Sequence, residues 1–288
     1  MAVTLSQIVV YPIKSCGGVS LDEATVSPIG LAGDREWQFV DDDRNGVTQR
    51  QHRVLATVRP EPLEDGGLRL TAPGRPAIDV DRDGSSTTVK SLFGVPVEAI
   101  DAGDDAARWF TDLTGASGRL VAMRDPGGWR LPEEFDLFGQ GAPFSDAAPI
   151  LVASRSSADW LAERASEPFG IDRFRANLIV SGAPAWDEDT WDRFAIGPVS
   201  LRAAAPWPRC QIPQVDQESG DAHKEPAKVL RAHRWCTEAP GIEGGFRSIV
   251  EGSGLFGIAC TIEPAGAVVR LGDELTVEST AAPVLAMD

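Results

Sequence analysis

The chain has 288 residues, of which 42% are hydrophobic and 24% charged, a composition typical of soluble globular proteins and not of disordered, collagenous or coiled-coil chains. Its 27 basic and 43 acidic side chains leave a formal net charge of −16 at pH 7. This excess of acid argues against nucleic acid and against an anionic membrane surface as partners, because both are bound through basic footprints.

The N-terminal segment and the cysteines favour a cytoplasmic protein. No basic segment precedes a long apolar run at the N-terminus, so a secretory signal is not expected, and the apolar run at 147–153 is too short to span a bilayer. The four cysteines, Cys16, Cys210, Cys236 and Cys260, are far apart in the chain and lack zinc-binding spacing. In the cytoplasm they are expected to be reduced thiols.

Glycine (29 residues) and proline (21 residues) break the chain into short segments, which favours strands over long helices. The predicted strands are, in chain order, 6–11, 38–41, 67–71, 87–92, 95–100, 151–153, 177–181, 199–203, 259–263, 267–271 and 274–278. The predicted helices are 104–114, 156–165 and 225–233. The sequence therefore predicts an α+β, mostly β fold that resembles a barrel and has a few peripheral helices.

A segment rich in glycine and proline at 125–143 is predicted to form a long loop. Loops of this length inside compact domains often have a function, such as covering a site. We place a domain boundary here, between an N-terminal β-rich region at 1–125 and a second region at 126–288.

The segment WPRCQIPQVDQESG, at 207–220, contains the strongest candidates for a reactive or metal-binding residue. Arg209 directly precedes Cys210, and a neighbouring cation favours the thiolate form, which is a nucleophile or a soft metal ligand. A nucleophile needs a base, but none of the three histidines is adjacent in sequence, and no other Cys or His stands at zinc spacing. A metal bound by Cys210 would take most of its ligands from a cofactor; the alternative is a buried structural cysteine.

The segment YPIKSCGG, at 11–18, places Lys14 and Ser15 at the end of a strand, before a Gly-Gly turn. Exposed amides, an ammonium group and a hydroxyl form a plausible phosphate-binding turn. A solvent-exposed junction between a strand and a turn is the alternative for this segment taken alone.

Two further segments place arginines next to strands. In GDREWQFVD, at 33–41, Arg35 stands at the start of a predicted strand and, taken alone, is a candidate for a surface ion pair. In RFRANLIVSG, at 173–182, Arg175 comes shortly before a strand that begins at Asn177.

Together these four segments, taken in chain order, resemble the MOSC family, in the type that has an N-terminal MOSC β-barrel region. The mitochondrial amidoxime reducing component and bacterial MOSC reductases are of this type. The resemblance covers nearly the whole chain, and it implies a MOSC-type β-barrel fold.

The resemblance also implies a molybdenum cofactor, to which Cys210 would supply a thiolate ligand while the pterin dithiolene supplies two further sulfurs. Asp146 matches a polar position near the open face of the metal, and is implied as a catalytic partner for a proton or the substrate. The residues that match the contacts to the pterin and its phosphate are Lys14, Ser15, Arg35, Ser154, Arg155, Ser156, Arg175, Asn177 and Arg209. Of these, 154–156 would approach the cofactor from the other side, at the start of a helix.

The function implied by the resemblance is molybdenum-dependent reduction of small N-oxygenated substrates such as amidoximes and hydroxylamines. Electrons would come from a separate ferredoxin, flavoprotein or cytochrome b5 type of donor, because the sequence has no plant-type iron–sulfur spacing. A second hypothesis is a carrier that passes on the cofactor, or a sulfur species on Cys210, without turnover. A third is a β-barrel binding module whose cofactor site has decayed, which the intact set of basic residues disfavours.

The chain departs from the family pattern near its C-terminus. Ala259 stands where the family often has a polar or aromatic residue, so one cofactor contact is expected to be missing or replaced. Cys260 beside it is expected to be buried.

Overall fold

The computed structural model describes residues 2–91, 94–128, 140–141, 144, 148–242 and 244–285. Its larger part contains β1 (Thr4–Val10), β2 (Val19–Leu21), β3 (Glu23–Ser27), β4 (Gly30–Leu31), β12 (Ile150–Ser154), β13 (Leu178–Ser181), β14 (Trp191–Ile196), β15 (Val199–Arg209), β16 (Trp235–Cys236), β17 (Ser253–Glu263), β18 (Val268–Arg270) and β19 (Leu275–Thr280). The smaller part contains β5 (Trp37–Val40), β6 (Arg59–Pro62), β7 (Leu68–Ala72), β8 (Arg75–Val80), β9 (Ser86–Lys90), β10 (Pro96–Asp101) and β11 (Arg119–Met123). The α-helices are α1 (Gly103–Thr114), α2 (Arg155–Ala162), α3 (Glu225–His233) and α4 (Gly244–Val250).

The large sheet curls back on itself. Its strand order is β19-β14-β15-β17-β12-β13-β1-β2, and its pairs are antiparallel except for β12 with β13. The start of β19 and the residues before it are hydrogen-bonded to the start of β1. The Leu5 amide donates to the Asp273 carbonyl at 2.9 Å, and the Leu275 amide donates to the Val3 carbonyl at 2.8 Å. These bonds bring the last strand against the first, so the predicted barrel-like, mostly β fold is confirmed.

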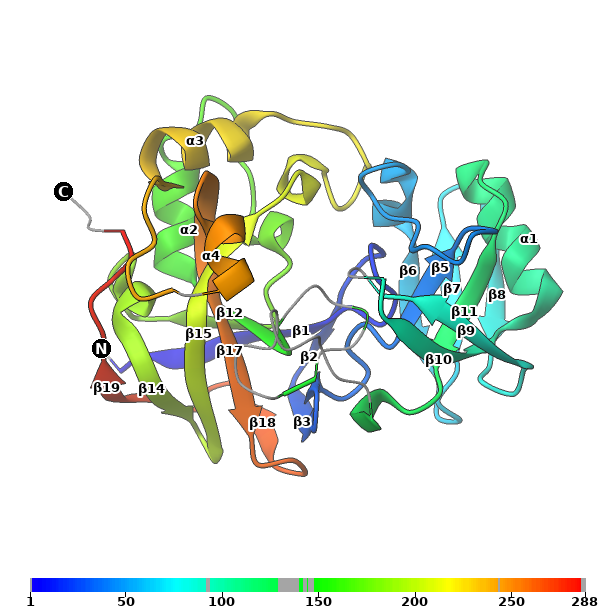
Figure 1. Ribbon diagram of the computed structural model, residues 1–288, viewed down its shortest axis with the longest axis horizontal. Coiled ribbons are helices and arrows are strands. Elements are labelled where there is room, and N and C mark those ends of the chain that lie inside the picture. The colour runs from blue at the N-terminus through cyan, green and yellow to red at the C-terminus, as the bar shows by residue number, and fades with distance from the viewer. Residues whose placement is uncertain are drawn as a thin grey trace.

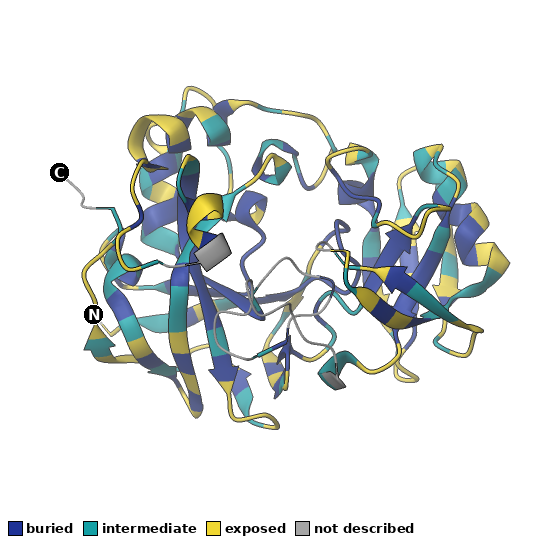
Figure 2. Ribbon diagram, viewed as in Figure 1, coloured by how far each residue is buried: buried dark blue, intermediate teal, exposed yellow. Residues whose placement is uncertain are grey.

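The strands β12 and β13 are buried on both faces, which explains their continuous apolar sequences. Along β12, Ile150 and Val152 pack into the interior of the curled sheet, whereas Leu151 and Ala153 pack outward. The outward cluster is covered by α2 and α3, which lie against this part of the sheet in Figure 1. Figure 2 shows the same strands as largely buried and the loops as exposed.

The smaller part has its own core, beside the curled sheet (Figure 1). It combines the sheet β5-β11-β10-β9 with the sheet β6-β7-β8 and with α1. The rings of Phe39 on β5 and Phe110 on α1 stack with centroids 5.0 Å apart. The left-handed Gly115, at φ +77°, ends α1 with a conformation that glycine adopts without a steric penalty.

Every predicted strand and helix overlaps an element of the structure, but the chain does not divide its strands neatly at residue 125. Strand β1, which belongs to the predicted region 1–125, pairs with β13 of region 126–288 within the curled sheet, and β3 pairs with β18 in a separate three-stranded sheet. The two predicted regions therefore share one curled sheet, and the boundary between them stays a prediction. Of the predicted loop at 125–143, residues 129–139 and 142–143 lie outside the described residues.

Candidate functional site

A pocket lies where the end of β15 meets the turn after β1 and the start of β12. Seven side chains predicted to bind the cofactor line it, namely Lys14, Ser15, Arg35, Arg175, Asn177, Arg209 and Cys210. The rest of its wall is apolar and consists of Phe144, Ala148, Ile150, Leu151, Phe174, Trp207, Pro208, Ile212 and Ala259. The fold thus brings four distant segments of the sequence to one cavity, which is lined by both basic and apolar side chains.

Three of the residues that line this pocket have a left-handed backbone although none is a glycine. Their φ angles are +68° at Ser15, +51° at Arg35 and +53° at Arg175. Such conformations cost on the order of 1 kcal/mol or more each, and they persist where surrounding contacts fix the backbone. Their concentration at one cavity makes it the candidate functional site.

Arg175, which lines the pocket, has a buried guanidinium. Its Nη1 donates to the Cys16 carbonyl at 2.7 Å and to Oε1 of Gln217 at 2.8 Å. Its Nη2 has no hydrogen-bond partner among the described residues, and neither does the buried Oγ of Ser15. Burial lowers the pKa of Arg175 to about 10, which still leaves the side chain cationic at neutral pH. The pocket therefore offers two buried donors that lack an acceptor.

Arg35 is fixed by a network at the rim of the same pocket. Its Nη1 forms an ion pair with Oδ2 of the buried Asp34 at 2.5 Å, and donates to Oδ1 of Asn177 at 3.3 Å. Its Nη2 donates to the Arg175 carbonyl at 3.1 Å. Asn177 is itself held by the Val9 carbonyl, to which its Nδ2 donates at 3.1 Å. These contacts set the direction of Arg35 before any ligand arrives.

Cys210 is exposed at the end of β15, where the Ile212 amide donates to its Sγ at 3.5 Å. Cys16, Cys236 and Cys260 are buried, and burial raises the pKa of each thiol, that of Cys16 to about 12. The alternative of a buried structural cysteine is therefore wrong for Cys210, although it describes the other three. Arg209 beside it donates from Nη2 to the Phe174 carbonyl at 2.7 Å.

We expect iodoacetamide to label the native chain once, at Cys210. The three buried thiols are shielded from the reagent, and their raised pKa values keep them protonated at pH 7 to 8. Mass spectrometry of digested protein measures this directly, with chain unfolded in denaturant as the control that labels four times. Rapid native labelling of a second cysteine would contradict the burial described above.

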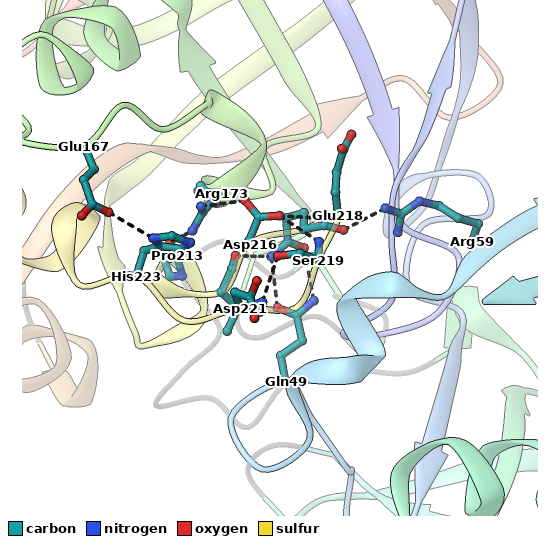
Figure 3. Close-up of polar contacts among 12 residues, drawn as sticks. Gln49, Arg59, Glu167, Arg173, Pro213, Asp216, Glu218, Ser219, Asp221 and His223 are labelled. Atoms are coloured by element: carbon teal, nitrogen blue, oxygen red, sulfur yellow. Dashed lines mark hydrogen bonds and ion pairs between the residues drawn. The ribbon is translucent and has the colours of Figure 1, made fainter. Parts of the chain in front are cut away.

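The loop after Cys210, residues 211–223, is folded around Asp216 (Figure 3). Asp216 forms an ion pair with Nη2 of Arg173 at 2.8 Å, and its Oδ1 accepts from the amides of Glu218 and Ser219 at 3.0 and 2.9 Å. The hydrogen bond from the Ser219 amide, followed by other contacts in this network, lowers the pKa of Asp216. Asp216 therefore shapes the loop that follows the thiol.

Sequence reasoning missed the pair of buried amides behind the pocket, Gln49 and Gln217. Their side chains exchange hydrogen bonds at 3.1 and 3.2 Å. Nε2 of Gln49 also donates to the Ser15 carbonyl at 2.7 Å, and Gln217 accepts from Arg175. The pair thus anchors both residues that have unsatisfied donors. Gln217 lies within the Cys210 segment at 207–220, but a neutral amide side chain has no feature that marks it in the sequence as part of a site.

Three predicted cofactor residues do not line the pocket. The Ser154 amide donates to the buried Glu188 at 3.3 Å, Arg155 donates to Gln7 at 3.1 Å, and the Ser156 hydroxyl donates to the Ala183 carbonyl at 2.8 Å. The strand β12 reaches the pocket with its first residues, Ile150 and Leu151, and Ser154 lies roughly 10 Å farther along it at about 3.3 Å per residue.

Asp146, the predicted catalytic partner, lies outside the described residues. Ala259 lines the pocket, so the position of the expected missing contact does face the cavity, with only a methyl group. Cys260 alternates to the other face of β17 and is buried in the core of the curled sheet, as expected.

Within the described ranges, no group of three or more His, Cys, Asp or Glu side chains is placed to bind a metal ion by itself. A metal held at Cys210 would have to bring its other ligands with it. None of the described helices is both long and apolar enough to cross a bilayer.

Comparison with known proteins identifies the family. Residues 2–117 match the model of the MOSC N-terminal beta barrel domain, and residues 140–276 match the MOSC domain. The mitochondrial amidoxime reducing component 2 of Rattus norvegicus is 34% identical over 286 residues, which cover 94% of this chain and 82% of that protein. The chain belongs to the MOSC family.

Two other proteins are also similar to this chain. The molybdenum cofactor sulfurase of Bombyx mori is 27% identical over 79% of this chain, which corresponds to 30% of that protein. The crystal structure of the YUAD protein from Bacillus subtilis aligns with 96% of this chain and with 94% of its own chain. The identity is 13% and the TM-score is 0.42.

Proposed function

We propose that this chain is a molybdenum-cofactor-dependent reductase of small N-oxygenated substrates, in which Cys210 supplies the protein ligand to molybdenum. The names of its relatives, which refer to amidoxime reduction and to the molybdenum cofactor, support this proposal. The observation that carries it is the pocket itself, where an exposed thiol and two buried donors without acceptors line one cavity.

The pocket residues fit the charge and the hydrogen-bonding needs of a pterin that bears a phosphate. Arg175 and Ser15 offer buried donors that still lack an acceptor, and such donors are costly unless a ligand satisfies them. Arg35 adds a guanidinium, a group that binds phosphate oxygens in a bidentate manner. Lys14, Asn177 and Arg209 complete the proposed set. A soft thiolate suits a metal that already has sulfur ligands.

When bound, the cofactor supplies the redox chemistry that removes oxygen from an N–O compound. The residues of the chain would hold the anionic part of the cofactor, while Phe144, Phe174 and Trp207 form an apolar wall that limits water in the pocket. From the sequence alone, we assign Asp146 to the movement of a proton during N–O cleavage. A ferredoxin, flavoprotein or cytochrome b5 type of protein is proposed as the electron donor.

Chain produced in a host that makes the cofactor is expected to contain about one molybdenum per chain, because the pocket offers a single exposed cysteine. It should reduce benzamidoxime when an artificial donor supplies electrons. Elemental analysis by mass spectrometry and detection of benzamidine measure the two properties separately. Loaded chain that transfers its cofactor to an acceptor enzyme, but reduces no N-hydroxylated compound, would instead support the carrier hypothesis.

A further inference from the structure

Two arginines of the candidate pocket lie over the ring of one tyrosine, Tyr11. The guanidinium carbon of Arg175 is 4.1 Å from the centroid of this ring, and that of Arg35 is 4.6 Å away. Tyr11 is the only tyrosine of the chain and is 4% exposed, at the residue that follows β1. Tyr11 does not line the candidate pocket; it lines a second hollow, together with Arg59 and Asp172.

The ring lies where the protein must hold two like charges close together. Arg35 donates to the backbone of Arg175, and the charge of Arg35 adds to burial in lowering the pKa of Arg175. Asp34 neutralises Arg35, but no described carboxylate forms an ion pair with Arg175. The face of an aromatic ring carries negative potential and attracts cations most strongly where water is excluded. Asp34 acts on the charge of Arg175 only without an ion pair, and the Tyr11 ring adds direct compensation to it.

The backbone and hydroxyl of Tyr11 have roles that can be separated from that of its ring. The Tyr11 amide donates to Asp34 at 2.8 Å, and its carbonyl accepts from the Arg35 amide at 2.8 Å. The hydroxyl makes only a long contact of 3.4 Å with the Ala176 carbonyl. A side-chain substitution therefore leaves the backbone contacts available, and phenylalanine keeps the ring while it removes one weak hydrogen bond.

We infer that Tyr11 is a positioning residue, whose ring holds Arg35 and Arg175 against it so that both guanidiniums face the pocket and bind one oxyanion together. Gly18 makes room for this arrangement, because a Cβ there would lie 2.7 Å from Cε1 of Tyr11. The identification of the oxyanion as the phosphate of the cofactor rests on the proposed function. The stacking of both arginines on the ring does not.

The test compares Tyr11→Phe with Tyr11→Leu in the loaded chain, using the rate at which molybdenum and pterin are lost during dialysis. We expect Tyr11→Phe to stay within about twofold of the original chain, and Tyr11→Leu to lose cofactor at least about tenfold faster, because it removes two desolvated cation–π contacts. Equal release rates for the two variants would overturn the inference.

A double-mutant cycle separates positioning from general packing. In an Arg175→Met background, Tyr11→Leu should change the release rate by less than about threefold, since one of the two side chains it positions is already gone. An effect as large as in the original chain would mean that the ring acts through packing alone, and would contradict the inference.

A measurement on the cofactor-free chain covers the case in which Tyr11→Leu fails to fold. Chain labelled with 13C in the tyrosine ring has one set of ring signals, because Tyr11 is the only tyrosine. We expect inorganic phosphate to shift these signals in the original chain but not in Arg175→Met. Absence of a shift in the original chain would overturn the inference, whereas a shift in a chain that never loads molybdenum would contradict only the proposed function.

Discussion

Replacing Cys210 by alanine is expected to abolish amidoxime reduction, with a loss of at least about a hundredfold, since even changes around a metal ligand typically cost ten- to a hundredfold. The side chain is exposed at the pocket, and the other three thiols are buried. The cofactor should be lost only in part, because the basic residues that would hold its phosphate remain. Activity per bound molybdenum is therefore the quantity to measure.

The control is the same substitution at a buried thiol. Cys236 is fully buried in a cluster with Phe246 and Leu255, outside the candidate pocket. Cys236→Ala should reduce stability by about 1 kcal/mol, as a small core truncation does, and leave activity per molybdenum unchanged. If Cys210→Ala reduced benzamidoxime at the original rate, Cys210 would have no part in the reaction and the proposed mechanism would be wrong.

Strands and helices could be predicted from the sequence wherever the local pattern of apolar residues matches the burial of the side chains in the structure. β15 shows where they diverge, because its predicted end at residue 203 precedes Pro206 and Pro208, whereas the strand continues to Arg209. Its pairing with β17 shifts register at 203/205 and at 206/208. Prolines are tolerated in a sheet at such irregular positions. The extension matters for function, because it places Cys210 at the end of a strand and not in a free loop.

Strand β14 went unpredicted for a related reason. Trp191, Phe194 and Ile196 all pack into the core of the curled sheet, but the spacing between the first two is three residues. The register of β14 against β19 shifts on both sides of Arg193, which explains that spacing. A bulge breaks the period of two on which recognition of a strand depends.

The charged part of the site could be predicted, because arginine, lysine and cysteine stand out in motifs that resemble a family. The parts that could not be predicted depend on long-range placement. Gln49 and Gln217 are 168 residues apart, and only the fold shows that they anchor Ser15 and Arg175. Arg155 shows the opposite case, because its motif position suggested a cofactor contact, whereas its side chain donates to Gln7 and it does not line the pocket.

Because the chain has few basic residues, the presence of several in one pocket is important for binding an anion. A chain with a net charge of −16 repels anions over most of its surface, so binding of a phosphate group requires a local concentration of positive charge. Lys14, Arg35, Arg175 and Arg209 line one pocket. Of these, Arg35 is partly neutralised by Asp34, whereas no described carboxylate forms an ion pair with the buried Arg175. Arg175 is therefore the residue from which the largest loss of cofactor binding is expected.

Arg175→Met is expected to leave the chain with less than about a tenth of the original molybdenum, because an uncompensated charge-assisted contact to phosphate contributes more than about 1.5 kcal/mol. Folding should change far less, because the substitution removes two hydrogen bonds but also removes the cost of burying a cation that has no ion pair. Molybdenum per chain and the midpoint of thermal unfolding, measured on the same preparations, separate these effects.

The matched variant is Arg155→Met, which makes the same chemical change at an arginine that the motif also assigned to the cofactor. Because Arg155 contacts Gln7 and does not line the pocket, its replacement should leave the molybdenum content within about twofold of the original. Equal losses in both variants would mean that the cofactor extends to the start of α2, and that the pocket described here is only part of its site. A loss confined to Arg175→Met would support the pocket as the place where this chain holds its anionic ligand.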